Sequence, residues 1–295
     1  MGIDRLRRIT QGLGALLGHG YLMVVATRAI YQGPLKGVCL PMMSCTACPA
    51  AIVSCPIGAL QHFMTLREVP WLLLGGLVLW GAIFGRMGCG WLCPFGLVQD
   101  LLYKLPSPKI SLPGEVRYLK YATLVVLVIA LPLLTQVPWF SQLCPVGTLT
   151  AGIPWVAWDP VDAAGRPALA SPTGMLFAVK VGILVALLVL IVASKRPFCR
   201  ALCPLGAIFS LFARVSLVRL RVAPACRGCG RCQSVCPVDH AVAADPGSGE
   251  CVRCLACTSC RHVEVGLAAD LAPAPPDNHE ARRGSPLGVE NGVGR

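Results

Sequence analysis

The chain has 295 residues, of which 55% are hydrophobic and only 14% are charged, and its mean hydropathy is +0.66. A soluble domain carries about 25% charged residues, so this composition excludes an ordinary soluble protein and predicts an integral membrane protein with a small soluble module. The formal net charge of +12 would suit a nucleic-acid partner. The basic residues, however, gather at the ends of apolar segments, where they act as topology anchors. We therefore expect no nucleic-acid partner.

Four apolar segments predict an all-α membrane domain with four spans, at about residues 9–30, 69–86, 118–137 and 175–194. The last two segments have the length of roughly 20 residues that crosses a bilayer. The second segment is short, and the first is interrupted by glycines. A cleaved signal peptide is the alternative for the first segment, but its apolar core is long and it lacks a clean small-residue cleavage site.

Lysine and arginine residues predict the orientation, because they favour the cytoplasmic side of a membrane. The loop after the third segment holds Arg166 against Asp159 and Asp162. We therefore expect a multi-pass protein of the bacterial inner (cytoplasmic) membrane, with both termini in the cytoplasm. The basic residues that lead to this orientation precede the first segment or follow the second and fourth, and are Arg5, Arg7, Arg8, Arg86, Lys104, Lys109, Arg117, Lys120, Lys195, Arg196, Arg200, Arg214, Arg219 and Arg221.

A short phrase, C-P-x-G, occurs four times, at Cys55, Cys93, Cys144 and Cys203. The second and fourth copies extend upstream into C-x3-C-P pairs, which begin at Cys89 and Cys199. Cysteines at i and i+4 project from one side of a helix. Two such pairs on pseudo-symmetric helices would converge on one thiolate site for a cluster or a soft metal such as Cu(I), Fe or Zn. Simple packing is the alternative, since proline favours the first helical turn and free cysteine is often buried.

A second group of cysteines falls on the opposite face of the predicted membrane. Four of its members, Cys45, Cys48, Cys55 and Cys144, are candidate metal ligands, and Cys39 lies nearby. Disulfides are an equal alternative for this group, because that face can be oxidising.

The stretch from Cys226 to Cys260 carries the strongest chemical signal. Its first half reads C-x2-C-x2-C-x3-C-P, the run in which three thiolates hold one [4Fe–4S] cluster and the fourth reaches the neighbouring cluster. We therefore predict two [4Fe–4S] clusters. Structural zinc knuckles are the alternative, but they need no proline-terminated run of this kind. The eight predicted ligands are Cys226, Cys229, Cys232, Cys236, Cys251, Cys254, Cys257 and Cys260.

Composition divides the chain into three parts. Residues 1–221 form the predicted membrane domain, and residues 222–263 form a small α+β ferredoxin domain of the bacterial 2[4Fe–4S] type. Residues 264–295 are rich in proline, glycine and polar residues, so we expect a disordered tail.

These motifs resemble the NapH/NosR/CcoG type of membrane 4Fe-4S ferredoxin family, the polyferredoxin-like membrane components of quinol dehydrogenases. The likeness covers about residues 35–260. It rests on the segments GRMGCGWLCPFGLVQDLLYK, RPFCRALCPLGAIFSLF and SCTACPAAIVSCPIGALQ. The resemblance implies electron transfer between a quinol pool and a partner redox enzyme or, in the CcoG branch, copper handling for oxidase assembly.

The resemblance also implies which cysteines hold which cluster. Cluster I would use Cys226, Cys229, Cys232 and Cys260, and cluster II would use Cys251, Cys254, Cys257 and Cys236. The chain departs from the family where Cys257 and Cys260 are separated by only two residues and Arg261 replaces the expected proline. It also lacks the N-terminal flavin-binding domain of the NosR kind.

We therefore expect an electron-transfer subunit of a membrane oxidoreductase in preference to a stand-alone enzyme, and no catalytic residue is predicted. The expected partners are the membrane and a redox subunit or metalloenzyme, with a quinone as a further candidate. A further thiolate-bound cluster or metal is a candidate at the C-x3-C-P pairs. The alternative function is copper or iron handling, or reduction, during assembly of a metalloenzyme. A scaffold subunit with structural clusters is a third interpretation.

Overall fold

The computed structural model describes residues 2–27, 30–158, 174–226 and 228–267. The loop with Asp159, Asp162 and Arg166 and most of the predicted tail therefore lie outside the described residues. The α-helices are α1 (Ile3–His19), α2 (Val24–Thr27), α3 (Pro56–Leu66), α4 (Trp71–Phe84), α5 (Met87–Trp91), α6 (Pro94–Leu102), α7 (Leu119–Ala122), α8 (Leu131–Thr135), α9 (Trp139–Leu143), α10 (Pro145–Gly147), α11 (Ile153–Trp158), α12 (Met175–Ala193), α13 (Pro197–Ala201), α14 (Pro204–Leu211) and α15 (Arg231–Ser234). The remaining elements are the 3-10 helices η1 (Pro34–Gly37), η2 (Gly114–Tyr118) and η5 (Ala256–Ser259), the π-helical η3 (Thr123–Ala130) and η4 (Thr148–Gly152), and the strands β1 (Val218–Val222) and β2 (Val263–Leu267).

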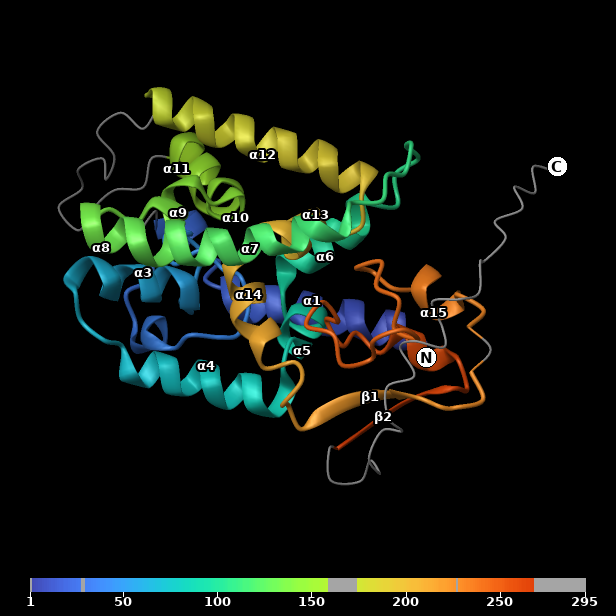
Figure 1. Cartoon of the computed structure of the whole chain (residues 1–295). Coiled ribbons are helices and arrows are strands. Elements are labelled where there is room, and N and C mark those ends of the chain that lie inside the picture. The colour runs from blue at the N-terminus through green and yellow to red at the C-terminus, as the bar shows by residue number, and fades with distance from the viewer. Residues whose placement is uncertain (1, 28–29, 159–173, 227, 268–295) are drawn as a thin grey trace.

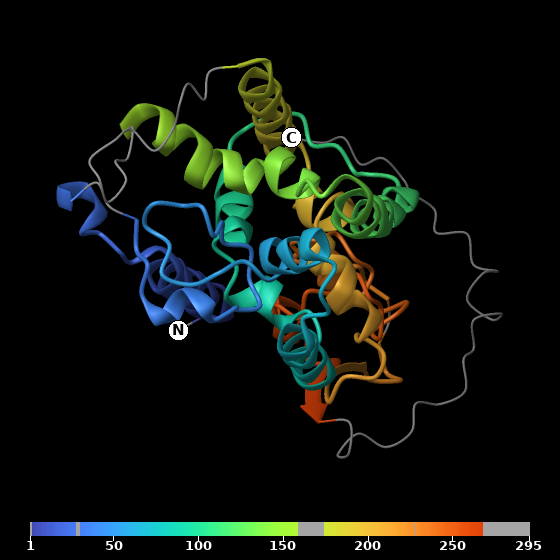
Figure 2. The same cartoon turned by 90° about the vertical axis from the view of Figure 1, so that its left-hand side faces the viewer.

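The axes of the long helices α4 and α12 and of the continuous α7–η3–α8 rod are roughly parallel across the molecule, and the chain runs along the rod in the opposite sense to α4 and α12 (Figure 1). Figure 2 looks nearly along these helices. Two helical segments are long and apolar enough to cross a membrane, Gly114–Thr135 and Met175–Ala193. Their apolar side chains, like those of the shorter α4, are largely exposed, and Leu72 of α4 is 93% exposed. Such surfaces mark a contact with lipid or with another protein, and the count of four spans stays a prediction.

The first predicted span differs from the observed helix. Helix α1 begins at Ile3, six residues earlier than expected, and ends at His19 before Gly20. It presents polar side chains to the interior, where Arg7 and Gln11 are buried, and its leucines to the exterior. The N-terminal basic turn is therefore part of the packed helix, and the chain does not continue as one helix to residue 30.

Two glycines allow α1 to approach the rest of the bundle closely. A Cβ at Gly14 would collide with the carbonyl oxygen of Leu92, and one at Gly18 would lie 2.7 Å from the Cε atom of Met42. Glycines four residues apart are a common means of close helix packing in membrane proteins. They hold α1 against α5 and α6, which belong to the first C-x3-C-P unit.

A proline within the α7–η3–α8 rod explains its π-helical part. In a π-helix the backbone N–H of each residue bonds to the carbonyl five residues earlier. Pro132 has no N–H group, so the carbonyl of Leu127 lacks this partner. The buried side chain of Gln61 donates to this carbonyl instead, with 3.0 Å between Nε2 and O. Its Oε1 accepts from the backbone N–H of Ser141 at 2.9 Å. One side chain thus joins α3, η3 and α9.

The substitution Gln61→Leu is expected to destabilise the protein by about 1–3 kcal/mol, because it leaves a buried carbonyl and a buried N–H without partners. Thermal unfolding of the detergent-solubilised protein measures this change. The matched control is Gln32→Leu at an exposed position. Equal melting temperatures for the two variants would contradict the role of Gln61.

The ferredoxin segment is closed by a two-stranded antiparallel sheet. Strand β1 precedes the eight cysteines and β2 follows them, with Val218 opposite Leu267 and Val222 opposite Val263. The segment does not pack as a separate body, since Cys236 and Cys254 belong to the same hydrophobic core as residues of the helical bundle. The expected mostly helical bundle is observed together with a small two-stranded sheet.

Candidate metal centre

All four C-P-x-G phrases adopt one local structure. Each cysteine caps the N-terminus of a helix with extended backbone, at φ between −75° and −63° and ψ between 110° and 126°. Proline takes the first helical position, where a missing N–H costs nothing. The N–H of Gly206, three residues after Cys203, donates to the Sγ atom of that cysteine at 3.3 Å. The phrase therefore presents a thiol at a helix N-terminus, where the negative thiolate is favoured.

The two C-x3-C-P pairs lie together in the structure. Cys89, Cys93, Cys199 and Cys203 are all buried and line one small, enclosed cavity, which we call the inner site. Helices α5 and α13 carry the first cysteine of each pair, and α6 and α14 begin after the second. The expected convergence of the pairs is observed, while their role as ligands stays a prediction.

The inner site has two halves, one from each C-x3-C-P pair, and an arginine from each half donates a hydrogen bond to the other half. Arg86 and Arg196 each stand three residues before the first cysteine of a pair, so the repeat reads R-x2-C-x3-C-P-x-G. Arg86 Nη2 donates to the carbonyl oxygen of Cys199 at 3.1 Å, and Arg196 Nη1 donates to that of Cys89 at 3.2 Å. Each residue is only 1% exposed. The sequence analysis treated both as topology anchors at span ends, whereas they belong to the interior of the site.

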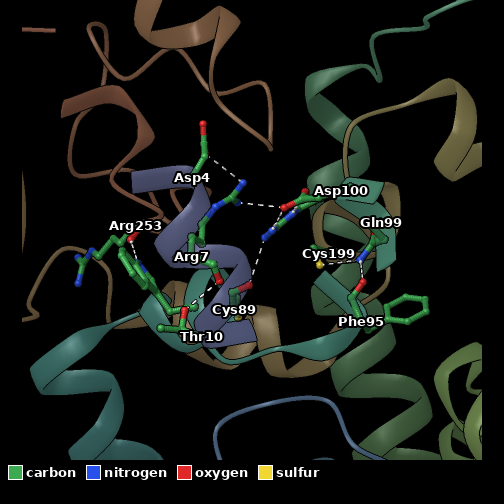
Figure 3. A network of polar contacts seen from close by, with 11 residues as sticks. Asp4, Arg7, Thr10, Cys89, Phe95, Gln99, Asp100, Cys199 and Arg253 are labelled. Carbon is green, nitrogen blue, oxygen red and sulfur yellow. Dashed lines mark hydrogen bonds and ion pairs between the residues drawn. The ribbon is translucent and has the colours of Figure 1, made fainter. Parts of the chain in front are cut away.

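Asp100 balances the charge of the first half. Its carboxylate accepts from Arg196 at 2.7 Å from Nε and 2.6 Å from Nη2, and Arg7 Nη1 lies 3.0 Å away. Figure 3 shows Arg7 directed at Asp100, and beside them the amide of Gln99 pointing to Cys199. The distance from Gln99 Nε2 to the Sγ of Cys199 is 3.1 Å. This hydrogen bond favours the thiolate form of the cysteine.

The second half of the inner site receives its carboxylate from the ferredoxin segment. Ser210 occupies the repeat position equivalent to Asp100, seven residues after the C-P cysteine. Glu250 provides the missing charge, with its carboxylate oxygens 3.6 Å from Arg86 Nη1 and 2.6 Å from Lys120 Nζ. The close contact between Gly249 and Ser210 brings Glu250 to this position.

The buried charged side chains of the described residues are all cations. Asp100 pairs with Arg7 and Arg196, and Glu250 pairs with Arg86 and Lys120, and both carboxylates are partly exposed. An excess of buried positive charge is costly unless anions lie close to it. A donor set of buried thiolates, as an iron–sulfur cluster or a soft metal ion requires, supplies such anions and fits this site. The buried cations are Arg7, Arg86, Lys120, Arg196 and Arg253.

The ferredoxin segment brings together the cysteines assigned to cluster II. Cys236, Cys251, Cys254 and Cys257 are buried and lie close enough for the charge of one to act on the next. Burial raises the pKa of the Cys251 thiol to about 11 and that of Cys257 to about 12. These thiols are therefore protonated at neutral pH unless a cation takes the place of the proton, so metal loading releases protons.

The cysteines assigned to cluster I are more open to solvent. Cys229 is exposed, Cys226 and Cys260 are half-buried, and Cys232 is buried. Within the described ranges, no group of three or more His, Cys, Asp or Glu side chains forms a site for a single metal ion, either here or at the inner site. The shorter spacing before Cys260 affects this more open half of the module. The eight ferredoxin assignments stay predictions.

The module contacts the inner site directly. Trp91 Nε1 donates to the carbonyl oxygen of Arg253 at 3.0 Å, and Arg253 donates to the carbonyls of Phe84 at 3.0 Å and Ala213 at 2.6 Å. A Cβ at Gly90 would lie 3.4 Å from the backbone of Cys254. Helix α5, which carries Cys89, is therefore packed against the loop that carries Cys254.

Comparison with known proteins identifies the family to which this chain belongs. A family model described as a 4Fe-4S binding domain matches residues 69–113 and 175–222, the two segments that contain the C-x3-C-P pairs. The ferredoxin-type methylamine utilization protein MauN of Paracoccus denitrificans is 30% identical over 74% of this chain and 74% of its own length. An uncharacterised protein of Methanocaldococcus jannaschii is 27% identical over 70% of this chain and 82% of its own length.

The chain belongs to the family of ferredoxin-type, membrane-associated proteins that includes MauN, NirI, NosR and NapH. It is an iron–sulfur electron-transfer protein of that family. The match to NosR of Pseudomonas aeruginosa covers 63% of this chain but only 24% of that larger protein, at 31% identity. No solved structure matches the chain.

The sequence analysis missed several polar residues of the inner site. The arginines were visible as an upstream extension of the repeat, but their charge was assigned to membrane topology. Gln11 is fully buried without a partner for its amide, and it lies beside Gly96 of the first C-P-x-G phrase. No sequence signal identifies Glu250, because its role depends on a contact between distant parts of the chain.

The substitution Glu250→Gln is expected to destabilise the protein by on the order of 3 kcal/mol, since it leaves Arg86 and Lys120 buried without their carboxylate. It should also loosen the ferredoxin segment, which limited proteolysis detects as faster cleavage between the bundle and the module. Glu264→Gln, at an exposed position of β2, is the control. Cleavage at the same rate in both variants would show that Glu250 does not secure the module.

Proposed function

We propose that this protein passes electrons between its ferredoxin module and the inner site, and from there to a membrane quinone or a partner redox enzyme. The observation that supports this most directly is the packing of the Cys254 loop against α5, which carries Cys89. Cys236 and Cys254 of the module and Cys89, Cys93 and Cys203 of the inner site also belong to one hydrophobic core. Iron–sulfur clusters supply one-electron chemistry when they are bound. The chain supplies thiols held at helix N-termini and arginines that stabilise negative charge.

The proposed setting is a multi-pass protein of the cytoplasmic membrane. Its four spans would be formed by α1, α4, the α7–η3–α8 rod and α12, with both termini and the module in the cytoplasm. Support comes from the exposed apolar side chains of these helices and from the inward-facing polar side of α1. A reducing compartment suits a module with many thiolate ligands.

The module is proposed to hold two [4Fe–4S] clusters, and the inner site to hold a third iron–sulfur centre. The double variant Cys93→Ser/Cys203→Ser tests the third centre, because serine keeps the helix cap while removing the thiolate. It is expected to lose the iron and sulfide of one centre while the EPR signals of the dithionite-reduced module persist. The control is Cys39→Ser, outside the inner site. Unchanged iron and sulfide in the double variant would overturn the inner site as an iron–sulfur centre.

Copper handling is a second candidate function, because the thioethers of Met42 and Met43 line the inner site beside the four thiols. Thioether and thiolate ligands together favour Cu(I). Under this alternative, the protein binds about one equivalent of Cu(I) per inner site, and binding is lost in Cys93→Ser/Cys203→Ser. Competitive titration with a chromophoric chelator measures the affinity. Equal Cu(I) binding by the double variant and the wild type would exclude this function for the inner site.

A further inference from the structure

The bundle contains a second cysteine-lined cavity at the end away from the ferredoxin module. It has a volume of about 510 Å³ and is lined by Cys45, Cys55 and Cys144. The elements around it, α3, α9 and α10, lie far from β1, β2 and α15 in Figure 1. We call this cavity the outer site. Its size and largely apolar wall are those of a cofactor cavity.

The outer site repeats the construction of the inner site. Cys55 and Cys144 stand at the N-termini of α3 and α10 as Cys93 and Cys203 stand at those of α6 and α14, with proline at the first helical position in each case. The backbone N–H of Cys55 is held by the hydroxyl of Thr46 at 3.1 Å. The outer site therefore has two thiols on facing helix N-termini, in the arrangement that the inner site uses.

The C-x2-C segment brings further thiols to these two. A Cβ at Gly147 would lie 3.4 Å from the Sγ of Cys45, so Cys45 packs against the phrase that begins with Cys144. Cys48 follows in a turn, with its N–H bonded to the carbonyl of Cys45 at 3.0 Å. Burial raises the pKa of both thiols, and the positive charge of Lys36 acts in the opposite sense by favouring their thiolate forms. Cys45, Cys55 and Cys144 line the cavity, and Cys48 is buried three residues after Cys45. Within the described residues the four thiols do not form a ready-made site for a single metal ion. Thiolate donors are the ligands that an iron–sulfur cluster requires.

The wall of the outer site touches the inner site. Met43 lines both cavities, and no other residue of the described chain appears in the linings of both. The two cavities therefore adjoin at Met43. This proximity suits electron transfer from one group to the other along the axis of the bundle.

We propose that Cys45, Cys48, Cys55 and Cys144 bind an additional iron–sulfur cluster, which exchanges single electrons with the inner site across Met43. With clusters bound at both sites, a single electron would pass from the reduced inner centre to the oxidised outer cluster and from there to a one-electron acceptor on that side, a quinone or a redox protein. The direction of transfer rests on the proposed function. The presence of the cluster rests on the outer cavity alone.

The test compares three forms of the full-length protein, purified without oxygen: wild type, Cys55→Ser/Cys144→Ser and Cys39→Ser. Serine at the two caps preserves the helix starts, and an unchanged melting temperature verifies folding. The outer double variant is expected to lose the iron and sulfide of one cluster, with the Mössbauer signal of a [4Fe–4S] centre reduced in proportion. Cys39→Ser should retain both.

The variant Cys93→Ser/Cys203→Ser separates this inference from the proposed function. Loss of iron in the outer variant without loss in the inner variant would support the outer cluster and overturn the inner one. Equal iron and sulfide in wild type and outer variant would overturn the outer cluster. So would a disulfide among these four cysteines in the wild type, detected by mass spectrometry after alkylation, or copper or zinc bound there in place of iron and sulfide.

Discussion

Buried positive charge is the constraint on which the rest of this structure depends. Arg86 and Arg196 lie in the interior because each reaches across to a carbonyl of the opposite repeat. That exchange fixes the two C-x3-C-P loops against each other. A guanidinium in such a place needs anions around it, and the chain offers one carboxylate for each together with the four thiols. The arginines, the acids and the cysteines are thus one electrostatic unit, and removing any part leaves a charge without compensation.

The same electrostatic unit explains how the ferredoxin segment is attached to the apolar helical bundle. Arg253 bonds to the carbonyls at the ends of α4 and α14, and Glu250 pairs with Arg86 and Lys120. These contacts are specific because each buried polar group finds its partner on the other side of the boundary. They also place the loop of Cys254 on the helix of Cys89, so the attachment and the proposed electron path use the same surface.

Sequence patterns predicted the helical bundle, the ferredoxin segment and the repeated C-P-x-G phrase, because hydrophobic runs and cysteine spacing are local properties of the chain. They also predicted that the two C-x3-C-P pairs would face each other. The hydrophobic pattern placed the first helix at residues 9–30, whereas α1 spans Ile3–His19. The first turns of α1 carry polar side chains that are buried in the bundle, and these side chains lower the hydropathy of that part of the helix. Sequence could not show the role of Glu250 or Gln61, because each of these residues acquires its function from a partner more than 60 residues away.

The contribution of Glu250 has a consequence for the biogenesis of the protein. The second repeat is synthesised before the segment that supplies its carboxylate, so Arg86 and Lys120 have no acidic partner until residue 250 has been made. The bundle can therefore close fully only around a finished ferredoxin segment.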